Sequence, residues 1–197
     1  NVAMAADAPT STTQSSGTDI KYYNKMVNND YKKTLEHNKK MYKNQRTDDD
    51  AIEKWSVNVT NDKDINALAK EITESKKSDY DKIKAIYTWV AENIYYDIDL
   101  LNNTKGFVAD VVDGAPSVIY ERRYAVCGGY TAFTVALLRA VGLAAKSVVG
   151  VVHNYNTRGH GWTEVWLKSE KRWLIMDTTW GSGNKYQKGK YTKGSVT

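Results

Sequence analysis

Three residues far apart in the chain have side chains that together could carry out nucleophilic catalysis: Cys127, His160 and Asp177. Cys127 is the single cysteine, and it stands at the start of an apolar segment. A thiol in the first turn of a helix is exposed to the positive end of the helix dipole, which favours the thiolate. The glycines that follow, Gly128 and Gly129, are expected to leave room for a substrate backbone. A lone cysteine is also common as a small buried hydrophobe, so the prediction of a nucleophile depends on its partners.

The partners are predicted from two short strands that would pair as a hairpin, one begun by His160 and the other ended by Asp177. A two-residue loop would pair Leu167 with Glu170 and set His160 opposite Asp177. A four-residue loop would pair Leu167 with Arg172 and leave Asp177 one diagonal step from His160. Because side chains alternate between the faces of a strand, both registers keep imidazole and carboxylate on the same face, about 4.5–8 Å apart at Cβ.

A carboxylate beside an imidazole fixes its tautomer and stabilises its protonated form, which in turn supports a cysteine thiolate. The simpler alternative is a cross-strand His–Asp pair on the surface, and that alternative leaves the cysteine at the helix start unexplained.

The composition excludes several other classes of chemistry. With one cysteine and three histidines, the chain has neither a disulfide framework nor a Cys-rich zinc module, and we expect no metal and no cofactor. Glycine-rich phosphate-binding motifs are absent from the sequence. No run of about 18 apolar residues is present, so we expect no transmembrane segment.

The elements that must position these residues begin with helices. Apolar residues recur at three- and four-residue steps from Ile20 to about Tyr42, and again around Ile65–Ile72 and Ile83–Ile94. Ser78, with Asp81 three residues later, has the pattern of a capping box. A further helix is expected over 127–141, ended by Gly142 at the position where helices commonly stop. Residues 98–120 are expected to form a loop.

Short segments rich in Val and Trp then change the period to that of strands, over 144–152, 160–167 and 172–177. Helices followed by antiparallel strands predict an α+β fold. The predicted organisation is a flexible lead-in over 1–17, a helical N-terminal extension over 18–60 and a catalytic domain over 61–197.

The order and setting of the three residues resemble the transglutaminase-like superfamily of papain-fold cysteine enzymes, in its bacterial branch. The segments that carry the resemblance are Cys127-Gly128-Gly129-Tyr130 opening a helix, His160-Gly161-Trp162 opening a strand, and Asp177-Thr178-Thr179-Trp180 closing the next. Residues 83–97 and 138–150 resemble the segments before and after the nucleophile. The papain-protease signature around the cysteine is absent, which favours the transglutaminase-like branch. The resemblance covers about residues 78–180, and residues 1–60 match nothing recognised.

The resemblance implies a core in which the nucleophile begins a helix packed on a small antiparallel sheet. It implies that Cys127 is the nucleophile, His160 the general base and acid, and Asp177 the residue that orients His160. The reaction would be attack on a protein or peptide amide, with a thioester as intermediate. Whether an amine or water resolves the thioester separates a cross-linking enzyme from a hydrolase, and the sequence leaves this open.

The Cys127 backbone N–H is one expected donor to the oxyanion of this reaction. Tyr96, Tyr120 and Tyr124 are candidates for the second donor.

Four tryptophans lie close together near the end of the chain. Trp162 and Trp180 stand near His160 and Asp177, and they are predicted to line the substrate cleft. Trp166 and Trp173 are expected to pack the sheet against the 127–141 helix.

Alternatives to acyl transfer are a cysteine peptidase with the same triad, or a non-catalytic module that binds cell-surface or cell-wall material. The basic segment 21–46 holds eight Lys or Arg and two acidic residues, which would suit an anionic cell-surface polymer. No recognised nucleic-acid module frames this segment, so nucleic acid is not an expected partner. The Ala-x-Ala start and the polar lead-in favour a secreted or cell-surface protein, and a cytoplasmic one stays open. The four lysines of 185–193 are interpreted as a soluble tail.

Overall fold

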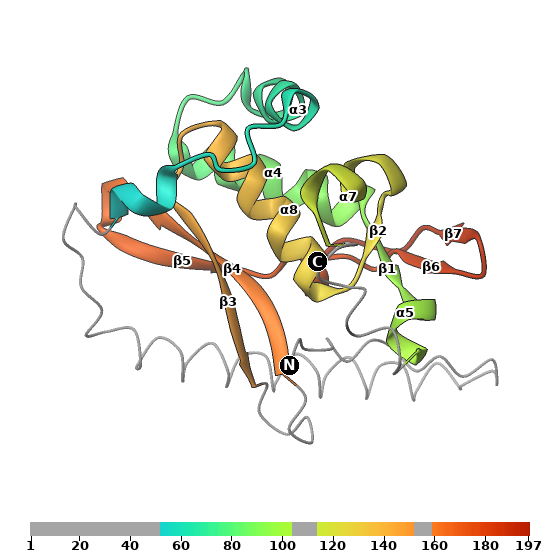
Figure 1. Ribbon diagram of the computed structural model, residues 1–197. Helices are drawn as coiled ribbons and strands as arrows, with labels where there is room; N and C mark the ends of the chain where they lie inside the picture. Colours follow the sequence, from blue (N-terminus) through green and yellow to red (C-terminus); the bar gives the residue numbers. More distant parts are fainter. Residues whose placement is uncertain (1–51, 104–113, 152–158) are drawn as a thin grey trace.

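The computed structural model describes residues 52–103, 114–151 and 159–197 (Figure 1). The predicted lead-in over 1–17 and the predicted helix from Ile20 to Tyr42 lie outside these residues. The described helices are η1 (Lys54–Ser56), α3 (Lys63–Thr73), α4 (Asp79–Asn93), α5 (Ile98–Asn102), α7 (Pro116–Arg122), α8 (Cys127–Ala140), η3 (Lys168–Glu170) and α9 (Thr178–Gly181). The strands are β1 (Tyr95–Asp97), β2 (Tyr124–Ala125), β3 (Ala145–Val151), β4 (Gly159–Leu167), β5 (Arg172–Met176), β6 (Lys185–Gln187) and β7 (Lys190–Thr192).

Helix α8 is the centre of the hydrophobic core. It packs on β3 and β4 on one side and against α3, α4 and α7 on the others (Figure 1). Because these elements surround it, α8 buries apolar side chains around most of its circumference, among them Phe133, Leu137 and Leu138. The helix ends at Ala140, within one residue of the predicted end, and Gly142 follows with a φ of 79°, in the left-handed region that favours glycine.

The two helices before the site follow their predicted patterns. Helix α3 buries Ile65 and Ala69, and α4 buries Ile83, Ile86 and Val90. The predicted cap of α4 is confirmed, because Ser78 Oγ accepts a hydrogen bond from the Asp81 N–H at 3.1 Å. Residues 63–93 thus form an amphipathic pair of helices that covers α8.

A three-stranded antiparallel sheet in the order β3-β4-β5 carries the other half of the predicted site. Leu167 pairs with Arg172, so the β4–β5 loop is the four-residue alternative. Within that loop Lys171 has a φ of 49°. The three predicted strands are confirmed to within about one residue at their ends.

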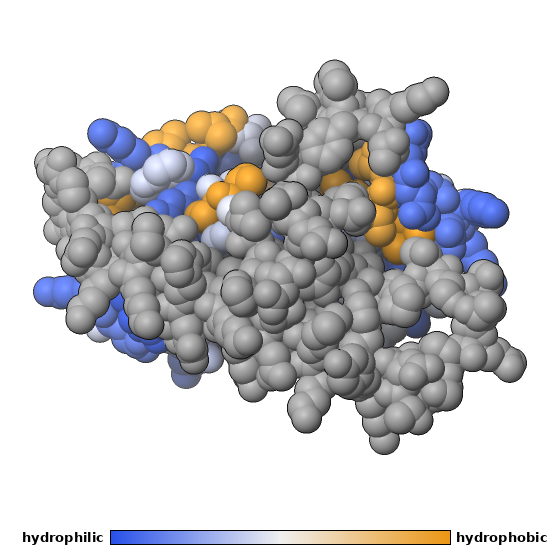
Figure 2. Space-filling view, turned by 90° about the horizontal axis from the view of Figure 1, so that it is seen from below, coloured by the Kyte–Doolittle hydropathy of each residue, from blue (hydrophilic) through white to orange (hydrophobic). Residues whose placement is uncertain are grey.

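A second sheet, in the order β2-β1-β6-β7, was not expected from the sequence. The strand β1 pairs in parallel with both β2 and β6, and β6 and β7 form an antiparallel hairpin. The interpretation of 185–193 as a soluble tail is therefore wrong. Stacked tyrosines hold the hairpin to the domain, since the rings of Tyr124 and Tyr186 lie 3.7 Å apart. Figure 2 shows hydrophilic side chains gathered on the side of the molecule where β6 and β7 lie.

The prediction of a loop over 98–120 is also wrong at both of its described ends. Helix α5 begins directly after Asp97, whose carboxylate accepts a hydrogen bond from the Leu100 N–H at 2.9 Å. Helix α7 begins at Pro116, a residue that suits the first helical position because its ring fixes φ and it lacks an N–H. Both helices are short, and local signals at their first turns, the Asp97 cap of α5 and the proline of α7, define them rather than a long apolar stripe. Among the helices of the described ranges, none is both long and apolar enough to cross a bilayer.

Candidate active site

Cys127 is the first residue of α8, as predicted, and it is fully buried. The residue before it, Val126, has an extended backbone and a side chain without hydrogen-bonding atoms. By contrast, α3, α4, α5 and α9 each begin with an Asp or Ser side chain that accepts a backbone hydrogen bond, and α7 shares the uncapped start of α8. The start of α8 therefore keeps its positive end free of a side-chain cap, which suits a negative charge that develops beside the thiol.

Gly129 has a different role from the one expected. A Cβ at this position would lie 2.6 Å from the Ala125 Cβ and 2.9 Å from Ile119 Cδ1. Gly129 is thus required where α8 packs closely on β2 and α7. The expectation that it makes room for a substrate backbone is wrong, because the space beside it is filled by the protein itself.

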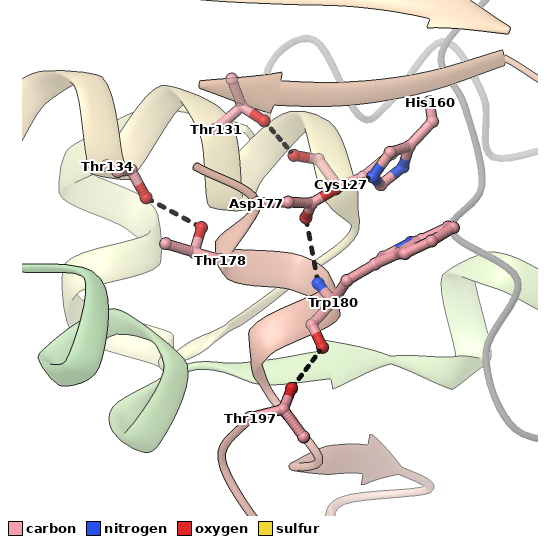
Figure 3. A network of polar contacts seen from close by, with 8 residues as sticks. All are labelled: Cys127, Thr131, Thr134, His160, Asp177, Thr178, Trp180 and Thr197. Carbon is pink, nitrogen blue, oxygen red and sulfur yellow. Dashed lines mark hydrogen bonds and ion pairs between the residues drawn. The ribbon is translucent and has the colours of Figure 1, made fainter. Parts of the chain in front are cut away.

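His160 and Asp177 meet as the hairpin parity predicted. Thr163 pairs with Met176, so Asp177 follows the last paired residue of β5 and lies one diagonal step from His160. The His160 Nε2 and Asp177 Oδ2 atoms are 2.5 Å apart, and the two residues are 2% and 3% exposed. Figure 3 shows the imidazole directed toward Asp177 and beside Cys127.

The electrostatics of the pair favour a protonated imidazole. Burial by itself lowers the pKa of His160. The charge and hydrogen bond of Asp177, together with the interaction with Cys127, outweigh burial and raise that pKa from 6.5 to about 10. At neutral pH His160 therefore carries a positive charge between a carboxylate and a sulfur, which is the arrangement that supports a thiolate.

Both carboxylate oxygens of Asp177 have a fixed partner. While Oδ2 faces His160, Oδ1 accepts a hydrogen bond from the Trp180 N–H at 3.0 Å and so caps α9. The cap holds the carboxylate in the orientation that His160 requires. In the described part of the chain, no group of three or more His, Cys, Asp or Glu side chains could hold a metal ion.

Trp162 and Trp180 flank the imidazole. The ring centroids lie 6.2 Å from His160 for Trp162 and 5.3 Å for Trp180. Trp162 is 5% exposed and lies over Gly150, where a Cβ would approach its Cη2 to 2.6 Å. The sequence placed both tryptophans near the site, and the structure brings both rings to His160.

Trp166 and Trp173 do not pack against α8, so that expectation is wrong. Their rings form an edge-to-face pair at 5.6 Å, in a separate cluster with Ile52 and Ala144. The neighbouring residues Val165 and Leu167 belong to the main core instead. Because side chains alternate along β4, Trp166 points away from the face on which its neighbours Val165 and Leu167 join the main core.

The three tyrosines proposed as oxyanion donors contact residues of α8, of the second sheet and of the end of α7. Tyr96 stacks on Tyr130 with 6.4 Å between ring centroids, and Tyr124 stacks on Tyr186. Tyr120 lies under the guanidinium of Arg123, 4.6 Å from its ring centroid. The identity of the second oxyanion donor stays a prediction.

Two features near the site were not found from the sequence. The Thr134 and Thr178 hydroxyls are hydrogen-bonded at 3.0 Å between α8 and α9 (Figure 3). Tyr87 of α4 lies near Asp177. Burial of the tyrosine and, to a smaller extent, the charge of Asp177 raise the pKa of Tyr87 to about 12. The spacing of Thr134, seven residues after Cys127, is the one signal that could have indicated a shared helix face.

The comparison with known proteins defines the class. The family model of the transglutaminase-like superfamily matches residues 66–178, which is more than half of the chain. The chain belongs to the transglutaminase-like superfamily, a family of cysteine enzymes, and its α+β fold is the one predicted from the sequence.

Three individual proteins illustrate the similarity. Kyphoscoliosis peptidase of Mus musculus is 26% identical over 134 residues, which are 64% of this chain and 19% of that protein. The protein YebA of Bacillus subtilis (strain 168) is 24% identical over 139 residues, 62% of this chain and 18% of that protein. The chain thus spans about a fifth of these relatives. A candidate cysteine protease from Cytophaga hutchinsonii shares the fold, with a TM-score of 0.53, 22% identity, and coverage of 67% of this chain and 43% of that one.

Proposed function

We propose that the chain is a cysteine-dependent acyl transfer enzyme that acts on protein or peptide amides. The observation that carries the proposal is the buried His160–Asp177 pair at 2.5 Å, with Cys127 at the start of α8 interacting with the same imidazole. In this proposal Cys127 is the nucleophile, His160 the general base and acid, and Asp177 the residue that orients His160.

The first half of the reaction forms a thioester. The Cys127 sulfur bonds to the amide carbonyl carbon, and the carbonyl oxygen takes up a negative charge at the start of α8. There the Cys127 backbone N–H is one donor, worth on the order of 3 kcal/mol in related acyl transfers. His160 then gives its proton to the departing nitrogen, the C–N bond breaks, and an amine or ammonia leaves.

The second half transfers the acyl group. An acceptor amine attacks the thioester carbonyl, His160 takes the proton from its nitrogen, and the C–S bond breaks to release the thiolate. We assign Trp162 and Trp180 to the walls of the substrate cleft, because their rings cover the imidazole on which both proton transfers depend. Walls of this kind exclude water, which supports transfer to an amine over hydrolysis.

A glutamine transfer assay tests the proposal. The protein is incubated with a Gln-containing protein and a fluorescent primary amine, and both label incorporation and ammonia release are measured. We expect incorporation with the natural sequence and none with Cys127→Ala. If the Gln-containing protein takes up no label and no ammonia is released, both cross-linking and deamidation are excluded.

The second candidate function is a cysteine peptidase that uses water as acceptor with the same three residues. The names of the mouse relative and of the Cytophaga protein favour it. Mass spectrometry separates the two functions, because a peptidase creates new peptide termini whereas transfer creates a new amide on an intact chain.

The alternative to both enzyme functions is a non-catalytic module that binds cell-surface or cell-wall material. Iodoacetamide at neutral pH tests it, because a thiolate alkylates far faster than an ordinary thiol. The proposed anionic polymer site in 21–46 lies outside the described residues. We also propose a secreted or cell-surface location. The single cysteine is compatible with it, because one cysteine avoids mispairing during export, and fractionation of the source cells tests it.

A further inference from the structure

We propose that Thr134 and Thr178 are positioning residues that set Asp177, and through it His160, relative to the Cys127 sulfur. This inference rests on the proposed function, because it concerns how the three catalytic side chains are held together. Neither threonine is expected to touch substrate.

The three proposed catalytic residues come from three different elements. Cys127 begins α8, His160 lies in β4, and Asp177 stands between β5 and α9. The distance from sulfur to imidazole therefore depends on how α8, β4 and α9 pack, and no single element fixes it. An error of about 1 Å in such a geometry can cost a factor of 100 in rate.

One contact places α8 beside β4. A Cβ at Gly161, next to His160, would lie 3.5 Å from Thr131 Oγ1 and 3.8 Å from the Cys127 carbonyl oxygen. Thr131 in turn donates a hydrogen bond to that carbonyl at 2.8 Å. This contact is made by close packing, so it limits the approach of the two elements but does not determine the position of Asp177.

A second contact joins α8 to the segment of Asp177. Thr134 Oγ1 and Thr178 Oγ1 lie 3.0 Å apart, and the two residues are 0% and 2% exposed. Thr134 is seven residues, or nearly two turns, after Cys127, so both share one face of α8. Thr178 directly follows Asp177 in the chain. The hydrogen bond thus connects the face of the nucleophile to the neighbour of the orienting carboxylate (Figure 3).

The direction of this hydrogen bond follows from the other partner of Thr134. The Thr134 hydroxyl also lies 2.7 Å from the Tyr130 carbonyl, to which it must donate because a carbonyl only accepts. The Thr178 hydroxyl therefore donates to Thr134 Oγ1. Because both hydroxyls are buried, no water can replace a lost partner. The hydrogen bond between them therefore holds α8 and α9 in one relative position.

The test uses Thr178→Val, which keeps the shape of the side chain, and Thr178→Ser, which keeps the hydroxyl. The readout is the ratio of Cys127 alkylation rates by iodoacetamide at pH 6 and pH 9, measured beside the melting temperature. We expect a ratio near one for the natural sequence. We expect the ratio to fall by about twofold or more in Thr178→Val, because a displaced imidazolium stabilises the thiolate less, and to be retained in Thr178→Ser.

The matched control is Thr73→Val in α3. Thr73 is also buried, and its hydroxyl donates to the Ala69 carbonyl of its own helix at 2.8 Å, so this variant removes a buried threonine hydroxyl without an interhelical partner. We expect it to leave the ratio unchanged.

Each other outcome overturns a different statement. An unchanged ratio in Thr178→Val, or an equal loss in Thr178→Ser, would show that the threonine pair does not position the site. If Thr178→Val does not fold, the serine variant alone decides, since a lost ratio there contradicts the role of the hydroxyl. A natural sequence that alkylates slowly at pH 6 would instead refute the proposed thiolate, and with it the proposed function.

Discussion

Replacement of Asp177 by Asn is the most direct test of the His160 electrostatics. The variant keeps the side-chain oxygen that accepts the Trp180 N–H, so the cap of α9 is preserved. In the natural protein Asp177 Oδ2 lies 2.5 Å from His160 Nε2. In the variant an amide NH₂ group, which donates a hydrogen bond, takes the place of this oxygen. We therefore expect a folded protein in which only the charge and the hydrogen-bond direction differ.

The magnitude follows from the pKa of His160. Its rise from 6.5 to about 10 corresponds to about 5 kcal/mol between the two protonation states, at about 1.4 kcal/mol per unit. Without the carboxylate, burial lowers this pKa and only Cys127 opposes it. His160 is then neutral at pH 7, and its tautomer is reversed because the amide donates to Nε2. Acyl transfer should fall by about 10⁴, the loss known for an orienting Asp in a comparable triad.

The assay measures iodoacetamide alkylation and acyl transfer from pH 5 to pH 10. Asp97→Asn is the matched control, because Asp97 is also a buried carboxylate that caps a helix, in this case α5. Near-natural rates are expected for the control. Rates and a pH profile in Asp177→Asn that match those of the natural sequence would refute the assignment of Asp177 and the reasoning about His160.

Three further predictions concern stability and the cleft. Because the folded pKa of His160 is raised to about 10, its protonation stabilises the fold fully below pH 6.5, and we expect melting temperatures to fall as the pH rises toward 10; His160→Gln should flatten that slope. Gly129→Ala should cost about 2 kcal/mol in chemical denaturation, since its Cβ would approach Ala125 to 2.6 Å; unchanged stability would contradict the packing assigned to it. Gly150→Ala should displace the Trp162 ring, whose Cη2 lies 2.6 Å from the added Cβ, so kcat/KM should fall about tenfold or more with a shifted tryptophan emission; a shift without a rate change would remove Trp162 from the cleft.

The proximity of His160 and Asp177 could be predicted from the sequence, because one rule decides which face of the sheet each side chain occupies. Alternation along two adjacent strands decides which side chains share a face, and each loop length that was considered preserves that relation. The pairing of Leu167 with Arg172 selected one of the two registers. The helix start at Cys127 followed from an equally local signal, the change from loop-like residues to a continuous apolar segment.

The second sheet could not be predicted because its signals are not local. Its strands have two or three residues, too few for a period to be seen, and Tyr96 pairs with Lys185 across most of the domain. The error for Trp166 has a related cause. Alternation groups Trp166 with Trp162 on one face of β4, but which face α8 covers is decided by tertiary packing.

The uncapped start of α8 connects stability with the proposed chemistry. An N-cap side chain contributes about 1 kcal/mol to a helix, and four other described helices have one. At α8 the corresponding residue is Val126, which is 6% exposed and packs into the main core. The apolar contacts of Val126 hold the first turn in place without using its backbone N–H groups. In the proposed reaction the positive end of the helix is thereby left for the oxyanion beside Cys127, while Asp177 caps α9 with one oxygen and faces His160 with the other. Helix capping thus contributes to the proposed site in two ways: a cap is absent beside the proposed nucleophile, and a cap holds the carboxylate.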